Sequence, residues 1–433
     1  MREKFGRSTK GDEKVPFATF VWSLVLHALC ADGSLGKHLR TVSGTMITDA
    51  AAQARRAGLS WAWFLALFDQ VLRPLAQRKT HPESFYHTMR VIAVDGSSWS
   101  LRNTPNNTQE AAPRHRNQKG GSAAFLKMSC AVLLEVGTHQ PLAVACEQGG
   151  LGRAEGELTL ARRLLGAIPR DEDTLLLGDR LYGCGRFIHE VREQAGPRAQ
   201  LLVRVKKSLK AKITQVLHDG SALIEVRVNH VGSNRLEAKL RLREVRGQVW
   251  RQSAGVIKCV EVRLWTTLLD AEKYPAEELL TLYAQRWEQE LFFRELKSHV
   301  GREHLLRAGT MQGAQAEFGA LILAAGVLAQ QRVAVADKLD VPPVRVSITK
   351  ISSGLAALLP VLAVAGDLIT EKQRQAIIKK FMAHLSREAI IAPRRKRTCQ
   401  RGLRKTTTAW PRIKTRCNAT GDLAYKVIPL TIP

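Results

Sequence analysis

The sequence predicts a mixed α/β fold that follows a helical N-terminal segment, contains an antiparallel β insertion and ends in a basic region. Three observations support this fold class. Residues 1–88 contain apolar blocks separated by helix-capping residues, short strand-like runs alternate with helical segments from residue 89, and residues 207–262 alternate apolar with basic residues. The 433 residues are 45% hydrophobic and 24% charged, which excludes a disordered chain, a collagen and a small disulfide scaffold.

Residues 1–88 are predicted to form a helical N-terminal domain. Apolar blocks at 17–30 and 61–76 are separated by short pieces, and the expected N-caps are Ser34, Thr48 and Ser60. Several Lys and Arg residues decorate these helices, as in a domain that binds DNA. A plain helical bundle with a solvated basic face explains the same pattern equally well.

The apolar stretch at 17–30 follows a mildly basic start and resembles a signal peptide. His27 lies within it and Ala28-Leu29-Cys30 lacks a small-residue cleavage site, so we expect a buried helix instead. The longest apolar runs, 318–329 and 354–366, are shorter than the roughly 20 residues that a membrane span needs. We therefore expect no membrane span.

The seven cysteines are odd in number and include no C-x-x-C pair, which argues against a zinc site or a disulfide framework. Buried free thiols in a reducing cytosol explain them best, so a cytoplasmic protein is expected.

The central region, residues 89–338, has the pattern of an α/β domain. A polar loop is expected at 105–119. The expected strands are 91–94, 124–135, 141–147, 174–178 and 200–206, and the expected helices are 156–165 and 186–194. Three strands followed by helix, strand, helix and strand predict a mixed sheet with helices on its faces.

Residues 207–262 interrupt this rhythm. Alternating runs at 222–228, 236–245 and 256–264, with turns expected at Asp219-Gly220 and Arg246-Gly247, predict an antiparallel β insertion. Helical periodicity then returns at 275–297 and 314–336.

Residues 339–433 are predicted to form a C-terminal helical and basic region for DNA contact or assembly. Between Pro393 and Cys417 this region contains ten Lys or Arg residues and no acid. The whole chain has 66 Lys and Arg against 39 Asp and Glu, a formal charge of +27. Such a surplus is self-repulsive unless a polyanion neutralises it, and nucleic acid is the leading partner.

Two acids follow apolar strands in this acid-poor chain: Asp95 after VIAV and Asp179 after LLLG. Strand ends at one edge of a sheet converge, and carboxylates placed there can hold hard divalent cations. A turn at Asp95-Gly96 and a helix cap at Asp179 are the structural alternatives.

The segment around residues 280–297 carries a third acid. With 3.6 residues per turn, Tyr283, Arg286, Glu290 and Lys297 share an arc of about 60° on a helix. Glu288 and Glu295 point elsewhere, so Glu290 is the candidate metal ligand. An internal pair of Arg286 with Glu290 is the alternative.

The spacing Tyr283-x2-Arg286-x3-Glu290-x6-Lys297 resembles the Y-R-E-K signature of DDE transposases from bacterial insertion sequences of the family-four type. The runs VIAVDGSSW and LLLGDRLYG resemble the two regions that supply the first and second Asp. The resemblance implies a ribonuclease-H-like catalytic core, with Asp95, Asp179 and Glu290 as a triad that holds two Mg²⁺ or Mn²⁺ ions.

By the same resemblance, Tyr283, Arg286 and Lys297 hold phosphates beside the cleaved bond, and Arg204 is expected to do likewise. An aromatic residue from the β insertion would catch a flipped base. Trp265 is the nearest candidate for this role, Trp250 is a second, and a core tryptophan explains either equally well.

The implied activity is metal-dependent cut-and-paste transposition: phosphodiester hydrolysis at the ends of the element, then strand transfer by the 3′-OH into target DNA. The implied partners are the terminal inverted repeats, target DNA and a second copy of the chain, in the cytoplasm at the nucleoid. Two alternatives remain open: another ribonuclease-H-like nuclease such as a resolvase, and a domesticated protein that binds DNA without cutting it.

Overall fold

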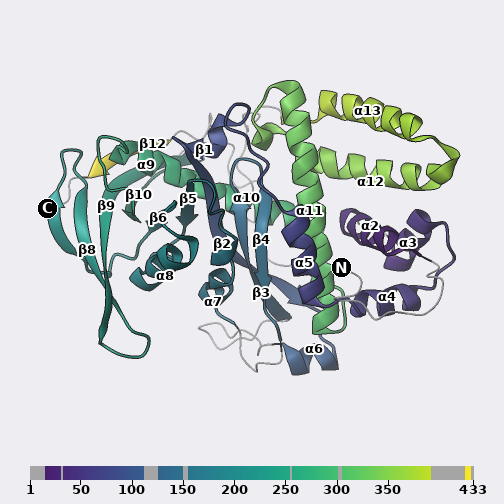
Figure 1. Cartoon of the computed structure of the whole chain (residues 1–433), viewed down its shortest axis with the longest axis horizontal. Helices are drawn as coiled ribbons and strands as arrows, with labels where there is room; N and C mark the ends of the chain where they lie inside the picture. The colour runs from purple at the N-terminus through teal and green to yellow at the C-terminus, as the bar shows by residue number, and fades with distance from the viewer. Residues whose placement is uncertain are drawn as a thin grey trace. The chain divides into compact units, whose positions relative to one another are not determined.

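The computed structural model describes residues 15–30, 33–111, 125–149, 155–253, 256–300, 305–391 and 425–430 (Figure 1). The chain forms two compact units. The first unit comprises Met1–Leu176, Glu193–Ala199 and Arg286–Ile390, and the second comprises Leu177–Arg192, Gln200–Gln285 and Ile391–Pro433. The basic segment 394–416, with Cys399, lies outside the described residues, as does Cys417.

The first unit begins with four helices: α2 (Phe17–Leu29), α3 (Leu35–Ser43), α4 (Asp49–Ala57) and α5 (Trp61–Val71). The side chains of Ser34, Thr48 and Ser60 accept hydrogen bonds from backbone N–H groups three residues later, so the three predicted N-caps are confirmed. Helix α2 buries one face in the core, as predicted for residues 17–30.

The sheet of the first unit is mixed. Strands β2 (Met89–Leu101), β3 (Leu126–Glu135) and β4 (Gln140–Cys146) are antiparallel neighbours. β1 (Phe85–Tyr86) pairs antiparallel with β2, whereas β11 (Leu305–Leu306) pairs parallel with it. β5 (Thr174–Gly178) begins in the first unit and ends in the second. The predicted α/β character is confirmed.

Two local predictions in this region are wrong. The strand at 91–94 does not end at Asp95 but continues to Leu101, because residues 95–101 pair with residues 126–132 of β3. The expected polar loop begins with helix α6 (Pro105–Glu110), which the Thr104 side chain caps. The predicted helix at 156–165 is α7 (Glu157–Arg162), followed by a 3₁₀ turn at Leu165–Ala167.

Helix α11 (Met311–Leu339) is the central helix of the first unit and packs against α2, α5 and β4 (Figure 1). Helices α12 (Ile348–Ala365) and α13 (Glu371–Glu388) follow it and pack against each other. One hydrophobic core joins the N-terminal helices to α11 and the sheet. The described residues between 15 and 88 thus share one hydrophobic core with part of the central region.

The second unit contains helix α8 (Gly185–Ala195) as far as Arg192, and it contains strand β6 (Ala199–Arg204) from Gln200 onward. Its remaining strands are β7 (Lys212–Val216), β8 (Ala222–Asn229), β9 (Leu236–Ser253), β10 (Val256–Thr266) and β12 (Tyr425–Leu430). The order β6-β10-β9-β8-β7 is antiparallel throughout, and β12 pairs with β9. The predicted β insertion is confirmed.

The turn expected at Arg246-Gly247 is wrong. Both residues lie inside β9, opposite Arg263 and Val262 of β10. The long β10 provides continuous backbone pairing across this point, so the glycine does not end the strand. The other expected turn, Asp219-Gly220, connects β7 and β8.

Two helices are long and apolar enough to cross a membrane by length and composition, α11 and α12. In α11, 78% of the most apolar window is buried inside the protein, as in a core helix, against 28% in α12. The apolar run 318–329 lies inside α11 and the run 354–366 overlaps α12, so the expectation of no membrane span stays a prediction. None of the five described cysteines is in a disulfide; Cys130 and Cys146 are buried, as predicted, whereas Cys259 is exposed.

Candidate active site

Strand β2 places three chemically able side chains on one face. Successive residues of a strand point to opposite faces, so Asp95, Ser97 and Trp99 share a face. Asp95 lies in the middle of the strand, opposite Val132 of β3, and its Oδ1 accepts a hydrogen bond from the Gly96 N–H at 2.9 Å. The acid is therefore held by a rigid strand rather than by a loop.

Helix α10 (Trp287–Glu295) brings a second acid and a shared cation to this strand. Nη1 of Arg286, the residue before α10, lies 3.7 Å from Oδ2 of Asp95, and its Nη2 donates to Oε1 of Glu290 at 2.8 Å. The Arg286–Glu290 pair expected as the structural alternative is present, but the same guanidinium also reaches Asp95. Two carboxylates distant in sequence thus share one positive charge.

Lys297 lies on the same side of the sheet. Its Nζ donates to Oγ of Ser97 at 2.6 Å and lies 4.6 Å from the centre of the Trp99 ring. Burial lowers the pKa of Lys297, and the nearby charge of Lys127 acts in the same direction. The hydrogen bond and the aromatic ring fix the position of this ammonium group beside Asp95 on β2.

The opposite side of α10 is anchored by a buried ionic network. His139 donates toward Glu295 at 2.8 Å and toward Glu288 at 3.0 Å, and Arg332 of α11 donates to Glu295 at 2.6 Å. The fully buried Gln289 donates to the Val132 carbonyl of β3. Glu288 and Glu295 therefore serve packing, and Glu290 is the acid beside Arg286.

The helical segment predicted at 275–297 is confirmed, but it is not one regular α-helix. Helix α9 (Ala276–Tyr283) ends in a 3₁₀ turn at Ala284–Arg286, and α10 passes into a π-helical turn at Leu296–Val300. Such turns often occur at functional sites because they re-aim side chains. Tyr283 belongs to the second unit, whereas Arg286, Glu290 and Lys297 belong to the first.

The second unit contains the other predicted acid. Asp179 follows β5 and its Oδ1 accepts a hydrogen bond from the Leu181 N–H at 2.6 Å, which is a turn contact; Asp179 is not the helix cap expected as its alternative role, because α8 begins at Gly185. The Tyr283 hydroxyl donates to the carbonyl of Gly178, the residue before Asp179, at 3.3 Å. The signature tyrosine and the second acid thus meet at the end of β5.

The turn after Asp179 also approaches Arg204 at the end of β6. A Cβ at Gly183 would lie 1.9 Å from the Arg204 carbonyl oxygen, so only glycine allows the two backbones to come this close. Arg204 Nη2 reaches the Glu261 carbonyl at 3.4 Å. The backbone of Arg204 therefore lies beside the turn that follows Asp179, whereas its side chain extends toward β10.

The two tryptophan candidates differ in what the structure describes. Trp265 is 1% exposed, and its Nε1 donates to the buried Glu244 at 2.7 Å, so in this conformation its ring presents no free face. A role for Trp265 in holding a flipped base stays a prediction and requires the ring to leave this position. Trp250 lies on β9, and its side chain is outside the described part of the structure.

Glu157 of α7 is a site residue that the sequence did not reveal. Its Oε1 accepts a hydrogen bond from the Gly96 N–H at 3.2 Å, next to the bond from the same group to Asp95. A Cβ at Gly96 would lie 2.3 Å from Cγ and Cδ of Glu157, so the glycine makes room for this acid. Ser97 and Trp99 were detectable from strand alternation after Asp95, whereas nothing local marks Glu157.

No cluster of three or more His, Cys, Asp or Glu side chains with metal-binding geometry is found among the described residues. The chemistry of the donors nevertheless suits a divalent cation. Asp95 and Glu290 offer only carboxylate oxygens, the ligands that Mg²⁺ and Mn²⁺ prefer, and both already bind one cationic group, Arg286.

Comparison with known proteins finds a matching family and a similar curated protein. The sequence pattern of the family described as "Transposase DDE domain" matches residues 86–326. The transposase InsG for insertion sequence element IS4 of Escherichia coli (strain K12) is 24% identical over 260 residues, which are 60% of this chain and 55% of that protein. The chain thus matches about half the length of this curated relative.

Among solved structures, a piggyBac transposase synaptic complex with hairpin DNA aligns with a TM-score of 0.46 and 10% identity, over 87% of this chain and 79% of that one. The family pattern, by contrast, covers more than half of the chain and includes Asp95, Asp179 and the segment with Glu290. The chain therefore belongs to the family of transposase DDE domains.

Proposed function

We propose that this protein is a DNA transposase that excises its insertion sequence and joins it to target DNA by a cut-and-paste reaction. The observation that carries the proposal is the pairing of Asp95 and Glu290 through Arg286, on two elements that are distant in sequence. Membership of the DDE transposase family supports it. We infer a ribonuclease-H-like core in which Asp179 completes the triad.

The three carboxylates would hold two Mg²⁺ or Mn²⁺ ions. When bound, such ions lower the pKa of water and stabilise the negative charge on phosphate oxygens. Asp95 lies on strand β2, Asp179 directly follows strand β5 and Glu290 lies on helix α10, so each ligand has a rigid support. Glu157, beside Asp95, adds negative charge to the same neighbourhood.

The basic residues would orient the DNA. The guanidinium group of Arg286 can grip two phosphate oxygens, and the ammonium of Lys297, held by Ser97 and Trp99, supplies a point charge. In the second unit, the Tyr283 hydroxyl and Arg204 would contact the backbone near Asp179. Each group would position the scissile phosphate and stabilise its charge.

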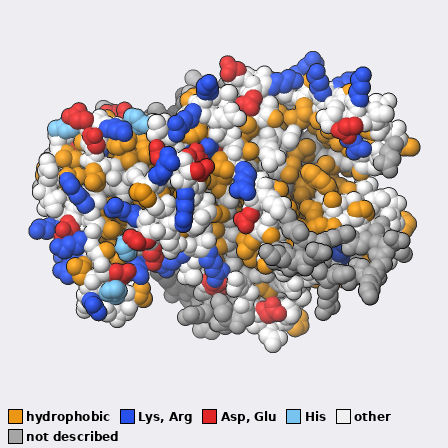
Figure 2. All heavy atoms as spheres, viewed as in Figure 1, with side chains coloured by type: hydrophobic (Ala, Val, Ile, Leu, Met, Phe, Trp, Pro, Cys, Tyr) orange, Lys and Arg blue, Asp and Glu red, His pale blue; other side chains and the backbone are white. Residues whose placement is uncertain are grey.

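The expected partners are the terminal inverted repeats of the element and target DNA, with a second copy of the chain to cut both ends together. Exposed Lys and Arg side chains line the strands of the second unit, and Figure 2 shows basic groups spread over this region. They include Lys206, Lys207, Lys210, Lys212, Arg227, Arg235, Lys239 and Arg241. These charges can neutralise DNA phosphates, and a cytoplasmic, nucleoid-associated protein is the corresponding expectation.

The test uses full-length protein and DNA that contains the boundaries of its own gene, where inverted repeats are expected. We expect Asp95→Asn, Asp179→Asn and Glu290→Gln each to abolish cleavage while DNA binding survives, because each change removes a ligand charge at nearly constant volume. Asp171→Asn, which neutralises an exposed acid outside the site, is the matched control and should cleave normally.

The outcomes separate the alternatives. Normal cleavage by any triad variant removes that residue from the triad. Wild-type protein that binds the ends without cutting them in Mg²⁺ or Mn²⁺ would indicate a domesticated DNA-binding protein. Cleavage without joining of the 3′-OH to a second duplex would indicate a resolvase-like nuclease.

A further inference from the structure

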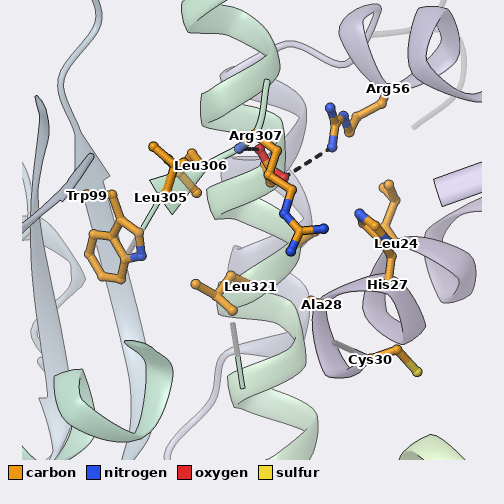
Figure 3. A pocket seen from close by; sticks show the side chains of 12 residues that line it. Leu24, His27, Ala28, Cys30, Arg56, Trp99, Leu305, Leu306, Arg307 and Leu321 are labelled. Carbon is orange, nitrogen blue, oxygen red and sulfur yellow. Dashed lines mark hydrogen bonds and ion pairs between the residues drawn. The ribbon is translucent and has the colours of Figure 1, made fainter. Parts of the chain in front are cut away.

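A cavity of about 60 Å³ lies within the first unit, and none of the three predicted acids lines it (Figure 3). It is lined by residues of α2, α4, β11 and α11, by Cys30 and Arg307, which follow α2 and β11, and by Trp99 of β2, whose ring also contacts Lys297. A single water needs about 10–15 Å³ by the same measure, so this cavity has room for a small polyatomic ion. Its charged or titratable lining residues are His27, Arg56, Arg307, Glu317 and Cys30.

Arg56 has an unusual environment for an arginine. Its side chain is only 7% exposed, and its Nε has no hydrogen-bond partner among the described residues. Its Nη1 lies 3.5 Å from Oε1 of Glu317, an ion pair longer than a good hydrogen bond. A buried guanidinium with an unused donor is costly, and an anion in the cavity would relieve that cost.

Glu317 does not cancel the positive charge of the cavity. Its Oε2 accepts hydrogen bonds from the backbone N–H groups of Arg307 at 2.8 Å and Ala308 at 3.0 Å. The two arginines and this one carboxylate sum to a formal charge of +1 (2 − 1). Figure 3 shows the ends of Arg56 and Arg307 directed toward the space beside His27.

His27 is uncharged at neutral pH. Burial lowers the pKa of His27 to about 4, and the positive charges of His38, Arg56 and Arg307 act in the same direction. Its Nδ1 shares a hydrogen bond with Nδ1 of His38 at 3.0 Å. The cavity therefore combines two fixed cations with a neutral imidazole, a set that favours an anion with several acceptor oxygens.

We propose that this cavity binds one phosphate group, held by Arg56 and Arg307 beside His27. Arginine suits a phosphate because its planar group offers parallel N–H donors to two oxygens. The phosphate could belong to a DNA backbone or be a free inorganic ion, and the two share the same chemistry. Only the DNA source rests on the proposed function. If the phosphate belongs to DNA, α2 and α4 would contact the DNA backbone through this site.

The test is calorimetric titration of full-length protein with inorganic phosphate, at fixed ionic strength in chloride. We expect saturable binding that Arg56→Gln and Arg307→Gln each weaken about ten-fold or more, because each removes a charge-assisted hydrogen bond. Arg73→Gln removes an exposed charge outside the cavity and should leave the affinity unchanged. Circular dichroism checks that each variant is folded, and Arg307, which is exposed, covers the case in which Arg56→Gln does not fold.

A second titration, on protein loaded with a DNA duplex, identifies the source. Phosphate binding that DNA abolishes assigns the cavity to a backbone phosphate, and binding that persists assigns it to a free ion. Absence of phosphate binding by the wild type, or equal affinity in folded Arg307→Gln and wild type, overturns the proposal. Neither readout needs cleavage, so failure here is distinguishable from failure of the proposed function.

Discussion

Glu295 offers the sharpest test of how the structure fixes α10, the helix that carries Glu290. Its carboxylate accepts hydrogen bonds from His139 and from Arg332, whose side chain is 1% exposed. Burial alone would raise the pKa of Glu295, but the charges of His139 and Arg332 outweigh it and hold the pKa at about 2. Glu295→Gln keeps the shape and removes the charge.

The expected loss of stability follows from this pKa. A pKa lowered from 4.5 to about 2, at 1.36 kcal/mol for each factor of ten in the proton affinity, corresponds to about 3 kcal/mol. Breaking a buried ion pair by removal of one partner costs about 3–5 kcal/mol, which agrees. We expect Glu295→Gln to lower the free energy of unfolding by about 3 kcal/mol at pH 6.

The pH dependence gives a second signature. Because the folded pKa is depressed, the stabilisation by Glu295 is complete above pH 4.5 and is lost as the pH falls toward 2. At pH 3 the difference between wild type and variant should shrink to about half its value at pH 6 or less by the same linkage. Glu295 and Glu288 raise the pKa of His139 against the effect of its burial, so His139 is charged at pH 6 as well.

Urea denaturation at pH 6 and pH 3 measures both quantities. Glu288→Gln is the matched control: this acid binds the other nitrogen of His139 but is 30% exposed, so we expect a loss of about 1 kcal/mol. A loss below about 1 kcal/mol for Glu295→Gln, or a loss that does not change with pH, would refute the reasoning. Cleavage should fall together with stability, because α10 also carries Glu290.

Three further predictions concern residues that are proposed to contact DNA. Arg286→Ala and Lys297→Ala should each reduce cleavage without loss of divalent-ion binding. Arg286→Ala should tighten ion binding, because Arg286 neutralises Asp95 and Glu290. Calorimetry that shows lost ion binding in either variant contradicts this prediction. Trp265→Phe should lower the free energy of unfolding, measured by urea denaturation, by about 1.5–3 kcal/mol, because it removes a hydrogen bond to the buried, charged Glu244. Unchanged stability together with a selective defect on substrates that contain a flipped base would favour a base-stacking role. Replacement of the ten Lys and Arg residues of 394–416 by Gln, with β12 retained, should make the slope of log affinity against log salt less steep by up to about nine (10 × 0.9). If the substituted protein has the same slope as the original protein on both specific and random duplexes, this segment does not contact DNA.

The sequence alone determined the features that depend on near neighbours. Caps at Ser34, Thr48 and Ser60 mark the N-terminal helices because a side-chain oxygen bonds a backbone group three residues away. The alternation of apolar and basic residues identified the β insertion, because it too is a pattern among near neighbours. The spacing from Tyr283 to Lys297 indicated the family, since a fixed motif is itself a local pattern.

Tertiary structure decided what depends on partners distant in the chain. Asp95 lies inside a strand because β3 extends its pairing to Leu101, and no residue near Asp95 encodes that extension. Glu157 reaches the site from α7, and His139 anchors the other side of α10 from the turn between β3 and β4. Burial of Trp265 depends on Glu244, 21 residues away. Long-range pairing and burial add up over many distant contacts, so they leave no local period in the sequence.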